Sequence, residues 1–479
     1  MYCNMLKGTN YFIFMNLKTR ISKKTFLLSL FIFCSISQIS NAQQISNAKQ
    51  LSQKIDELVK AYAALNQFNG TLLVSEKGNI VYQNAIGYQD AAAKKENTLN
   101  SIFQIGSLTK TFTSMLILKL AETHKLSIQD TISHYFPDFP PGKIITIEHL
   151  LSHSSGIYES FRNPDYIKDL NSDQKIASTH LMSYFSQEPL DFPPGTQFSY
   201  CNSGYNLLGL IIEKVTGLSY GKAVEKYIFK PFKMNHSGYN YNTLKDKNKT
   251  VGYAYLSNTR HVEVKPWNPD LTFSTGSLYS TTADLEKWYH VLRKNQFITE
   301  QSFSKATQDH LGGYGYGWFI DSINGKKVIN HGGNVEGGSS YFMIEPENDI
   351  SVILLNNMTS TKLERIGNAI LAILLDKPYT LPKPKIPVQL NETELQQYTG
   401  KFEVAENYRV NITTENGRLY LQINQEPVTE IYTAKPPLFF LKDDDMEISF
   451  KEPKEGKMSE IYLKKGLNSK SGERINSPL

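Results

Sequence analysis

Apolar residues recur along this chain at spacings that predict helices in some segments and strands in others. In residues 48–68 they stand three and four positions apart, which predicts an amphipathic helix. Residues 70–90 predict two strands around a Lys77-Gly78-Asn79 turn. The segment after Ser107, with "MLILKLA" at its centre, predicts an almost entirely apolar helix.

The second half of the first 376 residues returns from helices to strands. Segment 205–217 predicts a helix, and 362–377 predicts a closing amphipathic helix. Between them we predict four short strands, at 313–320, 326–333, 339–346 and 350–357. The last strands can pair with the first two. We therefore predict an α/β fold with one antiparallel sheet, flanked by helices, and a helical subdomain in the middle.

The C-terminal fifth has a different pattern. Residues 377–392 are rich in proline and predict a linker between domains. Residues 393–479 alternate apolar and polar positions in short runs, and Asn416-Gly417 is a strong hairpin signal. We predict a large domain over 43–376 and a small all-β domain, a barrel or curled sheet, over 393–479.

The N-terminal 42 residues predict a signal peptide. Five basic residues and no acidic ones precede a short apolar run, and a small-residue cleavage site ends at Ala42. The run is short for a membrane span, which needs roughly 20 residues; an uncleaved anchor is the alternative. We expect a periplasmic or secreted protein, attached to the membrane only if the signal stays uncleaved.

Charge and cysteine content exclude several kinds of partner. Without the signal segment, 46 basic residues balance 46 acidic ones, so no binding of nucleic acid is expected. Cys201 is then the only cysteine, and no intramolecular disulfide can form. No cysteine pairs or His-Glu-x-x-His pattern occur, so we expect no metal and no cofactor.

Ser107 and Lys110 form the first candidate for chemistry. A Ser-x-x-Lys pattern alone is weak evidence, because four other serines in the chain have a lysine at the same spacing. Ser107 follows Gly106 at the start of the apolar helix, where free backbone N–H groups favour developing negative charge. Lys110 lies one turn on, and in a dry environment it could accept a proton. The alternative is an exposed lysine at a helix start.

Two further motifs follow in the sequence. Tyr200 and Asn202 are two positions apart in an extended segment, so both can project to one side. His331-Gly332-Gly333 lies on a predicted strand, where small residues let a substrate backbone lie along the strand edge.

Several neighbouring residues have simpler interpretations. We expect Cys201 to be a buried packing residue that alternates away from the site. His153, in "LLSHSSG", is expected to have a structural role in a loop. The aromatic side chains of Tyr314, Tyr316 and Trp318 are expected in the core, with one tyrosine as a candidate for the cleft.

Taken in order, the three motifs resemble the serine hydrolase family of class C β-lactamases, DD-peptidases and related esterases. The resemblance extends to residues 145–157, 193–220 and 274–288 and covers about residues 50–376. The C-terminal domain is similar, more weakly, to the lipocalin-like domain of some of these hydrolases. The resemblance implies a penicillin-binding-protein-like fold and a small-molecule or peptide substrate.

The resemblance also implies roles for the site residues. Ser107 would be the nucleophile that forms an acyl-enzyme, and Lys110 and Tyr200 would share the base role. We expect Lys110 to lower the pKa of Tyr200, which would then deprotonate Ser107. Asn202 would hold the substrate amide or steady Lys110. The oxyanion would lie between the backbone N–H groups of Ser107 and Asn334.

The third motif departs from the β-lactamase pattern, which usually has Lys-Thr-Gly there. His331 would be mostly neutral at pH 7, so recognition of a substrate carboxylate is weakened. This favours a peptidase, amidase or esterase over a β-lactamase proper. A catalytically silent penicillin-binding or scaffold protein is the alternative outside enzymes.

Overall fold

The computed structural model describes residues 48–475, apart from short gaps at 258–259, 360, 385, 406–407, 425–427, 442–445, 452, 455 and 466–467. The predicted signal peptide lies outside the described residues. Within the described residues no helix has the length and apolar character needed to cross a bilayer.

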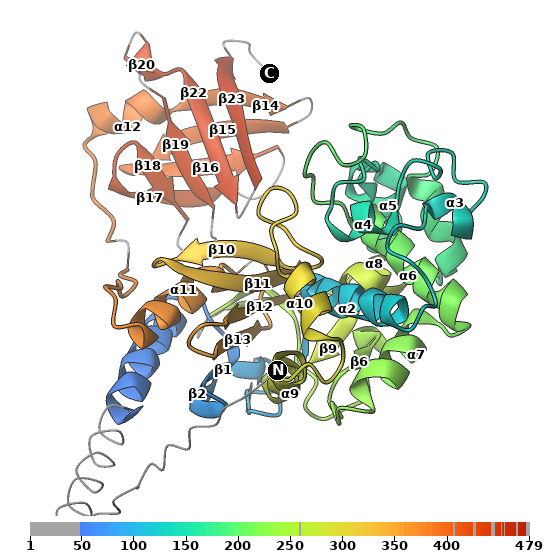
Figure 1. The fold of residues 1–479 in the computed structure, drawn as a ribbon. Helices are drawn as coiled ribbons and strands as arrows, with labels where there is room; N and C mark the ends of the chain where they lie inside the picture. Colours follow the sequence, from blue (N-terminus) through green and yellow to red (C-terminus); the bar gives the residue numbers. More distant parts are fainter. Residues whose placement is uncertain are drawn as a thin grey trace, which may run out of the picture. The chain divides into compact units, whose positions relative to one another are not determined.

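A six-stranded antiparallel sheet is built from both ends of the first 376 residues (Figure 1). Its order is β10-β11-β12-β13-β1-β2. The strands are β1 (Gly70–Glu76), β2 (Asn79–Ile86), β10 (Phe319–Ile323), β11 (Lys326–Val335), β12 (Gly338–Glu345) and β13 (Ile350–Asn356). Gly70 of β1 stands opposite Asn356 of β13. The predicted pairing of the last strands with the first two is therefore confirmed.

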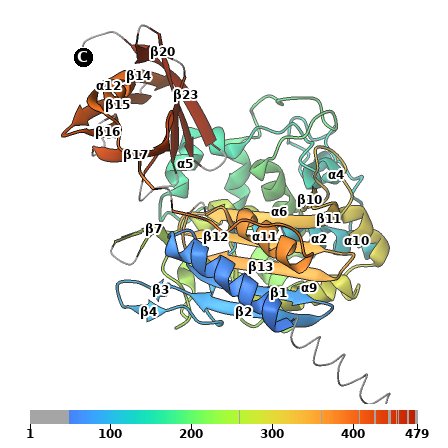
Figure 2. The ribbon, with the colours of Figure 1, turned by 90° about the vertical axis from the view of Figure 1, so that its left-hand side faces the viewer.

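Helices cover both faces of this sheet. Helix α11 (Leu363–Leu374) packs on β12 and β13, and Figure 2 shows residues 54–64 of the first helix on the same face. Helix α9 (Thr282–Arg293) contacts β13 and β1 from the other face. The strands between these layers are buried on both sides, so β12 and β13 are almost continuously apolar or small.

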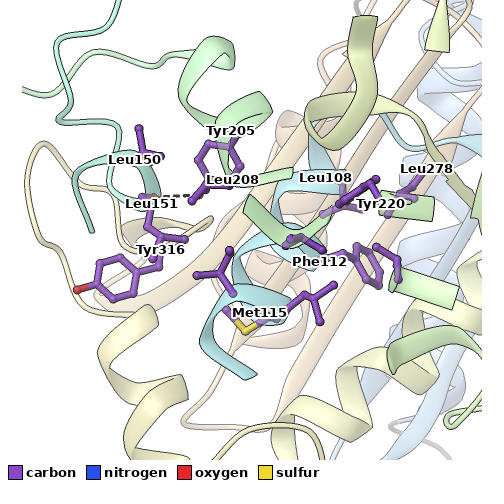
Figure 3. Close-up of a cluster of buried hydrophobic side chains, with 14 of the residues drawn as sticks. Leu108, Phe112, Met115, Leu150, Leu151, Tyr205, Leu208, Tyr220, Leu278 and Tyr316 are labelled. Carbon is purple, nitrogen blue, oxygen red and sulfur yellow. Dashed lines mark hydrogen bonds between the residues drawn. The ribbon is translucent and has the colours of Figure 1, made fainter. Parts of the chain in front are cut away.

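The helical region centres on α2 (Thr109–Glu122). Eleven of its fourteen residues are buried, which explains its apolar sequence. Figure 3 shows Phe112 and Met115 of α2 among side chains from distant segments, such as Leu150, Leu208 and Leu278. This core anchors the helix that begins two residues after Ser107.

Apart from α6, the remaining elements before residue 377 are short. The helices are η1 (Gly106–Leu108), α3 (Ile132–Tyr135), α4 (Ile147–Leu151), η2 (Ser160–Arg162), α5 (Pro164–Leu170), η3 (Ser178–Tyr184), α6 (Asn202–Thr216), α7 (Tyr220–Val224), η4 (Glu225–Phe229), η5 (Tyr241–Thr243), α8 (Pro269–Gly276) and α10 (Glu300–Ala306). The strands are β3 (Tyr88–Asp90), β4 (Lys95–Glu96), β5 (Phe103–Gln104), β6 (Gly238–Tyr239), β7 (Tyr253–Leu256), β8 (His261–Glu263) and β9 (Leu278–Ser280).

The C-terminal part forms a closed eight-stranded barrel, so of the two predicted forms, a barrel or a curled sheet, the structure has the barrel. Its order is β14 (Gly400–Ala405), β15 (Tyr408–Glu415), β16 (Arg418–Ile423), β17 (Thr429–Lys435), β18 (Leu438–Phe440), β19 (Glu447–Phe450), β22 (Glu460–Lys465) and β23 (Asn468–Ile475). The two-residue strands β20 (Pro453–Lys454) and β21 (Lys457–Met458) pair with each other. Phe402, Ile448 and Ile461 are fully buried members of its apolar cluster, so side chains fill the interior.

Two predicted elements need correction. The strand predicted over 313–320 begins only at Phe319, because the glycine-rich residues before it form turns that bury Tyr314, Tyr316 and Trp318. The predicted all-β segment starts with a helix, α12 (Glu392–Tyr398). Asn391 and Glu394 form a capping box there, a sequence signal that we overlooked.

Candidate active site

Ser107 lies in the 3-10 turn η1, directly before α2. Gly106 precedes it with φ of +52°, a conformation that favours glycine. A Cβ on Gly106 would lie 2.9 Å from the backbone nitrogen of Asn334 in β11. The glycine thus lets the Ser107 turn approach the strand with the His331-Gly332-Gly333 motif.

Lys110 is completely buried and its ammonium group contacts Ser107. Its Nζ lies 3.1 Å from the Ser107 Oγ, 2.9 Å from the Asn202 Oδ1 and 3.1 Å from the Thr275 carbonyl oxygen. Burial lowers the pKa of Lys110 to about 7, and the Glu159 charge opposes this shift. A substantial fraction of Lys110 is therefore neutral at physiological pH. The exposed-lysine alternative is excluded.

The three partners of Lys110 also determine the direction in which the lone pair of its neutral amine points. A carbonyl oxygen and an amide Oδ1 only accept hydrogen bonds, whereas a serine hydroxyl both donates and accepts. A neutral Lys110 has two N–H groups, which Asn202 and Thr275 can accept. The remaining lone pair then faces Ser107, in position to receive its proton.

Glu159 orients Asn202 from the opposite side. Its Oε2 accepts the Asn202 backbone N–H at 2.5 Å, and its Oε1 accepts the Asn202 Nδ2 at 3.3 Å. Because the amide NH2 group faces Glu159, the Oδ1 faces Lys110. Sequence reasoning missed Glu159, since no local pattern connects it to a residue 43 positions away.

Replacing Glu159 by glutamine should shift the pH profile of kcat/KM toward lower pH. The Glu159 charge raises the pKa of Lys110, so its removal lowers that pKa and leaves more neutral lysine at pH 6. The measurement is kcat/KM for a p-nitrophenyl ester between pH 5 and 9. Glu148→Gln is the matched control, because Glu148 bonds Tyr316 and pairs with Lys305 instead. An unchanged ascending limb in Glu159→Gln would refute this coupling.

The Tyr200 ring lies beside Lys110, with the Nζ 4.9 Å from the ring centroid. Burial raises the pKa of the Tyr200 phenol, and a hydrogen bond with Ser107 opposes the rise. We expected a lowered Tyr200 pKa, but the net shift is upward, because desolvation outweighs the hydrogen bond with Ser107. Tyr200 is therefore a neutral phenol, able to donate a proton, at pH 7.

His331 is buried beneath the site and is neutral. Burial, and less strongly the Lys110 charge, lower the pKa of His331 to about 3. The His331 Nε2 lies 3.1 Å from the Tyr314 hydroxyl, and its Nδ1 lies 2.6 Å from the Gly332 carbonyl oxygen. The expectation of a neutral side chain in place of a lysine charge is thus confirmed. Tyr314 is buried, as expected for a core residue, and its ring packs against the ring of Tyr200.

The free edge of β11 lies next to the Ser107 turn. The β10 ladder ends at Asn330, while β12 pairs with β11 as far as Val335. A Cβ on Gly333 would lie 2.0 Å from the Ile105 carbonyl oxygen, so only glycine permits this approach. The arrangement brings the backbone of Asn334 beside Gly106, the residue that precedes Ser107.

A strained turn in α8 presents the third partner of Lys110. Phe273 has φ of 31° and ψ of −117°, outside the helical region and costly for a bulky residue. After this kink the Thr275 carbonyl points at Lys110. Sequence reasoning could not identify Thr275, because its contribution is a backbone oxygen.

Cys201 is a packing residue, as expected. It is buried, its Sγ lies 3.2 Å from the Ile157 carbonyl oxygen, and burial raises the pKa of its thiol. Within the part of the chain that the structure describes, no cluster of three or more His, Cys, Asp or Glu side chains is placed to hold a metal ion.

Comparisons with known proteins place this geometry in a family. Penicillin-binding protein 4* of Bacillus subtilis is 28% identical over 426 residues, 83% of this chain and 93% of that protein. The octameric penicillin-binding protein homologue from Pyrococcus abyssi has the same fold, with a TM-score of 0.61, 24% identity and coverage of 88% of this chain and 99% of that one. The D-stereospecific amidohydrolase from Streptomyces sp. also has this fold, with a TM-score of 0.56 and 23% identity. The match covers 65% of this chain and 98% of that one.

Two family models cover most of the chain. The model described as a domain of unknown function, DUF3471, matches residues 384–474. The Beta-lactamase model matches residues 55–376, well over half of the chain, and includes every site residue described above. The chain therefore belongs to the Beta-lactamase family and is a serine hydrolase of that family.

Proposed function

We propose that this protein hydrolyses an amide or ester through an acyl-enzyme on Ser107. The observation that supports this most directly is the buried Lys110 ammonium group, held by Asn202 and Thr275 with its third partner the Ser107 Oγ. A buried lysine with a pKa near 7 is costly to maintain, and proton transfer with a serine explains it.

In the acylation step, neutral Lys110 takes the proton of Ser107 as the Oγ attacks the substrate carbonyl carbon. The oxyanion that forms accepts hydrogen bonds from the backbone N–H groups of Ser107 and Asn334. Tyr200, a neutral phenol beside Ser107, donates a proton to the departing amine or alkoxide. The products are the acyl-enzyme and the protonated leaving group, and the tyrosinate recovers a proton from Lys110.

Deacylation reverses these roles. A water molecule attacks the ester carbon of the acyl-enzyme and transfers its proton to the Tyr200–Lys110 pair. The C–O bond to Ser107 then breaks, and the Ser107 Oγ recovers a proton from Lys110. The product is a carboxylic acid, and the site returns to its initial protonation state.

We propose a peptide, amide or ester substrate rather than a β-lactam. His331 is neutral, so it supplies no positive charge to hold a carboxylate at the place where many β-lactamases have a lysine. The similarity to proteins named as penicillin-binding protein and D-stereospecific amidohydrolase supports substrates of the D-amino-acid peptide or amide class. A β-lactamase proper remains the second candidate, which the family match favours.

We also propose that the protein acts outside the cytoplasm. The basic and apolar N-terminal segment supports export, with cleavage after Ala42. N-terminal sequencing of the protein recovered from its native host would test this.

Incubation with a fluorophosphonate probe, followed by intact mass and peptide mapping, tests the function. The wild type should gain one adduct on Ser107, and Ser107→Ala should gain none. Rates with a p-nitrophenyl ester, a D-alanyl anilide and a chromogenic cephalosporin then rank the substrates. An unlabelled wild type would support a catalytically silent protein, and a cephalosporin rate above the other two would support a β-lactamase.

A further inference from the structure

Tyr200 lies in a segment without regular secondary structure. Residues 197–201 belong to no helix or strand, and α6 begins only at Asn202. For proton transfer, the Tyr200 hydroxyl must be held within a few tenths of an ångström of its proper position relative to Ser107. Contacts with other segments of the chain must therefore hold it in place. The structure supplies this support from His153, almost fifty residues earlier in the chain.

His153 holds the residues on both sides of Tyr200. Its carbonyl oxygen accepts the backbone N–H of Ser199 at 2.9 Å, and its Nδ1 accepts the backbone N–H of Cys201 at 3.0 Å. Its ring also packs on the Tyr200 ring, with centroids 4.2 Å apart. Backbone and ring contacts together restrict the position and the tilt of the phenol.

The geometry of His153 is costly, which argues against a residue that merely fills the core. Its φ is +54°, in the left-handed region that few non-glycine residues adopt. Since Nδ1 accepts a hydrogen bond, a neutral ring has its proton on Nε2, and that atom is buried without a hydrogen-bond partner among the described residues. Burial keeps the pKa of His153 well below its ordinary value, so the ring stays neutral.

We propose that His153 is a positioning residue that places the Tyr200 hydroxyl for proton transfer with Ser107. This inference rests on the proposed function. In this role His153 contacts neither the substrate nor Ser107 and acts only through Tyr200. An aliphatic residue could fill the same space, but it would leave the Cys201 N–H unpaired and the Tyr200 segment free to move.

A double-mutant cycle with Tyr200→Phe tests the proposal. His153→Phe keeps a ring and removes the acceptor for Cys201. A displacement of a catalytic group by about 1 Å can cost about 10²-fold. We expect His153→Phe to lower kcat for a p-nitrophenyl ester 10- to 100-fold with little change in KM, but less than about threefold when Tyr200 is already Phe. Equal losses in both backgrounds would overturn the proposal.

Two further variants separate positioning from general stability. Asparagine tolerates the left-handed conformation and offers an amide oxygen in place of Nδ1, so His153→Asn should recover most of the kcat lost in His153→Phe. His149→Phe is the matched control, because the His149 Nδ1 also accepts a backbone N–H, from Thr146. It should lower Tm without coupling to Tyr200. Failure of His153→Asn to exceed His153→Phe would argue against the acceptor role.

A crystal structure of His153→Phe gives a readout that does not depend on activity. The Tyr200 hydroxyl should move away from Ser107 in this variant. A Tyr200 in its wild-type position would overturn the inference, whatever the rates. Failure of the proposed function would appear separately, as a wild type that fluorophosphonate does not label at Ser107.

Discussion

Replacing Lys110 by methionine should lower kcat/KM for a p-nitrophenyl ester by about 10³-fold or more. General-base catalysis contributes about 10²- to 10⁴-fold, and Lys110 also holds Asn202 in place. The wild-type kcat/KM should rise with pH through about 7, because only the neutral lysine accepts the Ser107 proton. Steady-state rates from pH 5 to 9 measure both effects, and the variant should lack this ascending limb.

Lys119→Met is the matched control for this substitution. Lys119 is on the same helix, but its side chain is partly exposed and pairs loosely with Glu122 at 3.9 Å. It should retain wild-type activity. A Lys110→Met enzyme with activity near that of the wild type would refute the role of Lys110 as the base.

The lowered pKa of Lys110 should also make the free energy of unfolding depend on pH. Between pH 7 and its ordinary pKa of 10.5, Lys110 binds more protons in the unfolded than in the folded chain. Its contribution to the free energy of unfolding should therefore rise by about 1.4 kcal/mol per pH unit in this window and stay constant below it. Chemical denaturation of wild type and Lys110→Met at several pH values isolates this contribution as the difference between the two.

Gly333→Ala should cost about 10²- to 10³-fold in kcat, the effect of losing one oxyanion donor. Its Cβ would meet the Ile105 carbonyl oxygen at 2.0 Å and the Ser340 Oγ at 2.6 Å. Since the first is a backbone atom, the turn before Ser107 must move away from β11, which separates the N–H groups of Ser107 and Asn334. Single-turnover acylation rates measure the loss directly.

Gly332→Ala tests whether this loss is specific. The nearest atom to its Cβ would be the Ser340 carbonyl oxygen at 3.7 Å, an ordinary contact. Its acylation rate should fall much less than that of Gly333→Ala, and its Tm should stay close to that of the wild type. Equal losses in the two variants would show that the gap between the Ser107 turn and β11 is not critical.

Periodicity in the sequence was sufficient to predict the six-stranded sheet's pairing and an all-β C-terminal domain. A strand that is buried on both faces has a continuous apolar run, as in β12 and β13. A strand that is buried on one face alternates apolar and polar residues, as in β15 of the C-terminal part. The prediction failed at 313–320, where alternating aromatic residues imitate a strand. Glycines at 313 and 317 have positive φ there and turn the chain instead.

Part of the candidate site was also predictable. Ser107 and Lys110 are one helical turn apart, so their contact follows from local geometry. The resemblance of the three motifs, taken in order, to a known hydrolase family implied that Tyr200, Asn202 and the His331-Gly332-Gly333 segment converge on them. Glu159, Thr275 and the positioning contacts of His153 were not predictable, because they join residues that are far apart in sequence through backbone atoms or single carboxylates.

The sequence by itself determined the main strands of the sheet, the apolar helix after Ser107, and which hydroxyl and amine lie one turn apart. Only the tertiary structure decided the protonation states on which the chemistry depends. It showed Lys110 with a pKa near 7 and a Tyr200 whose pKa is raised instead of lowered. The physical reason is that desolvation and hydrogen bonding depend on all the atoms around a group, and those atoms come from many separate segments.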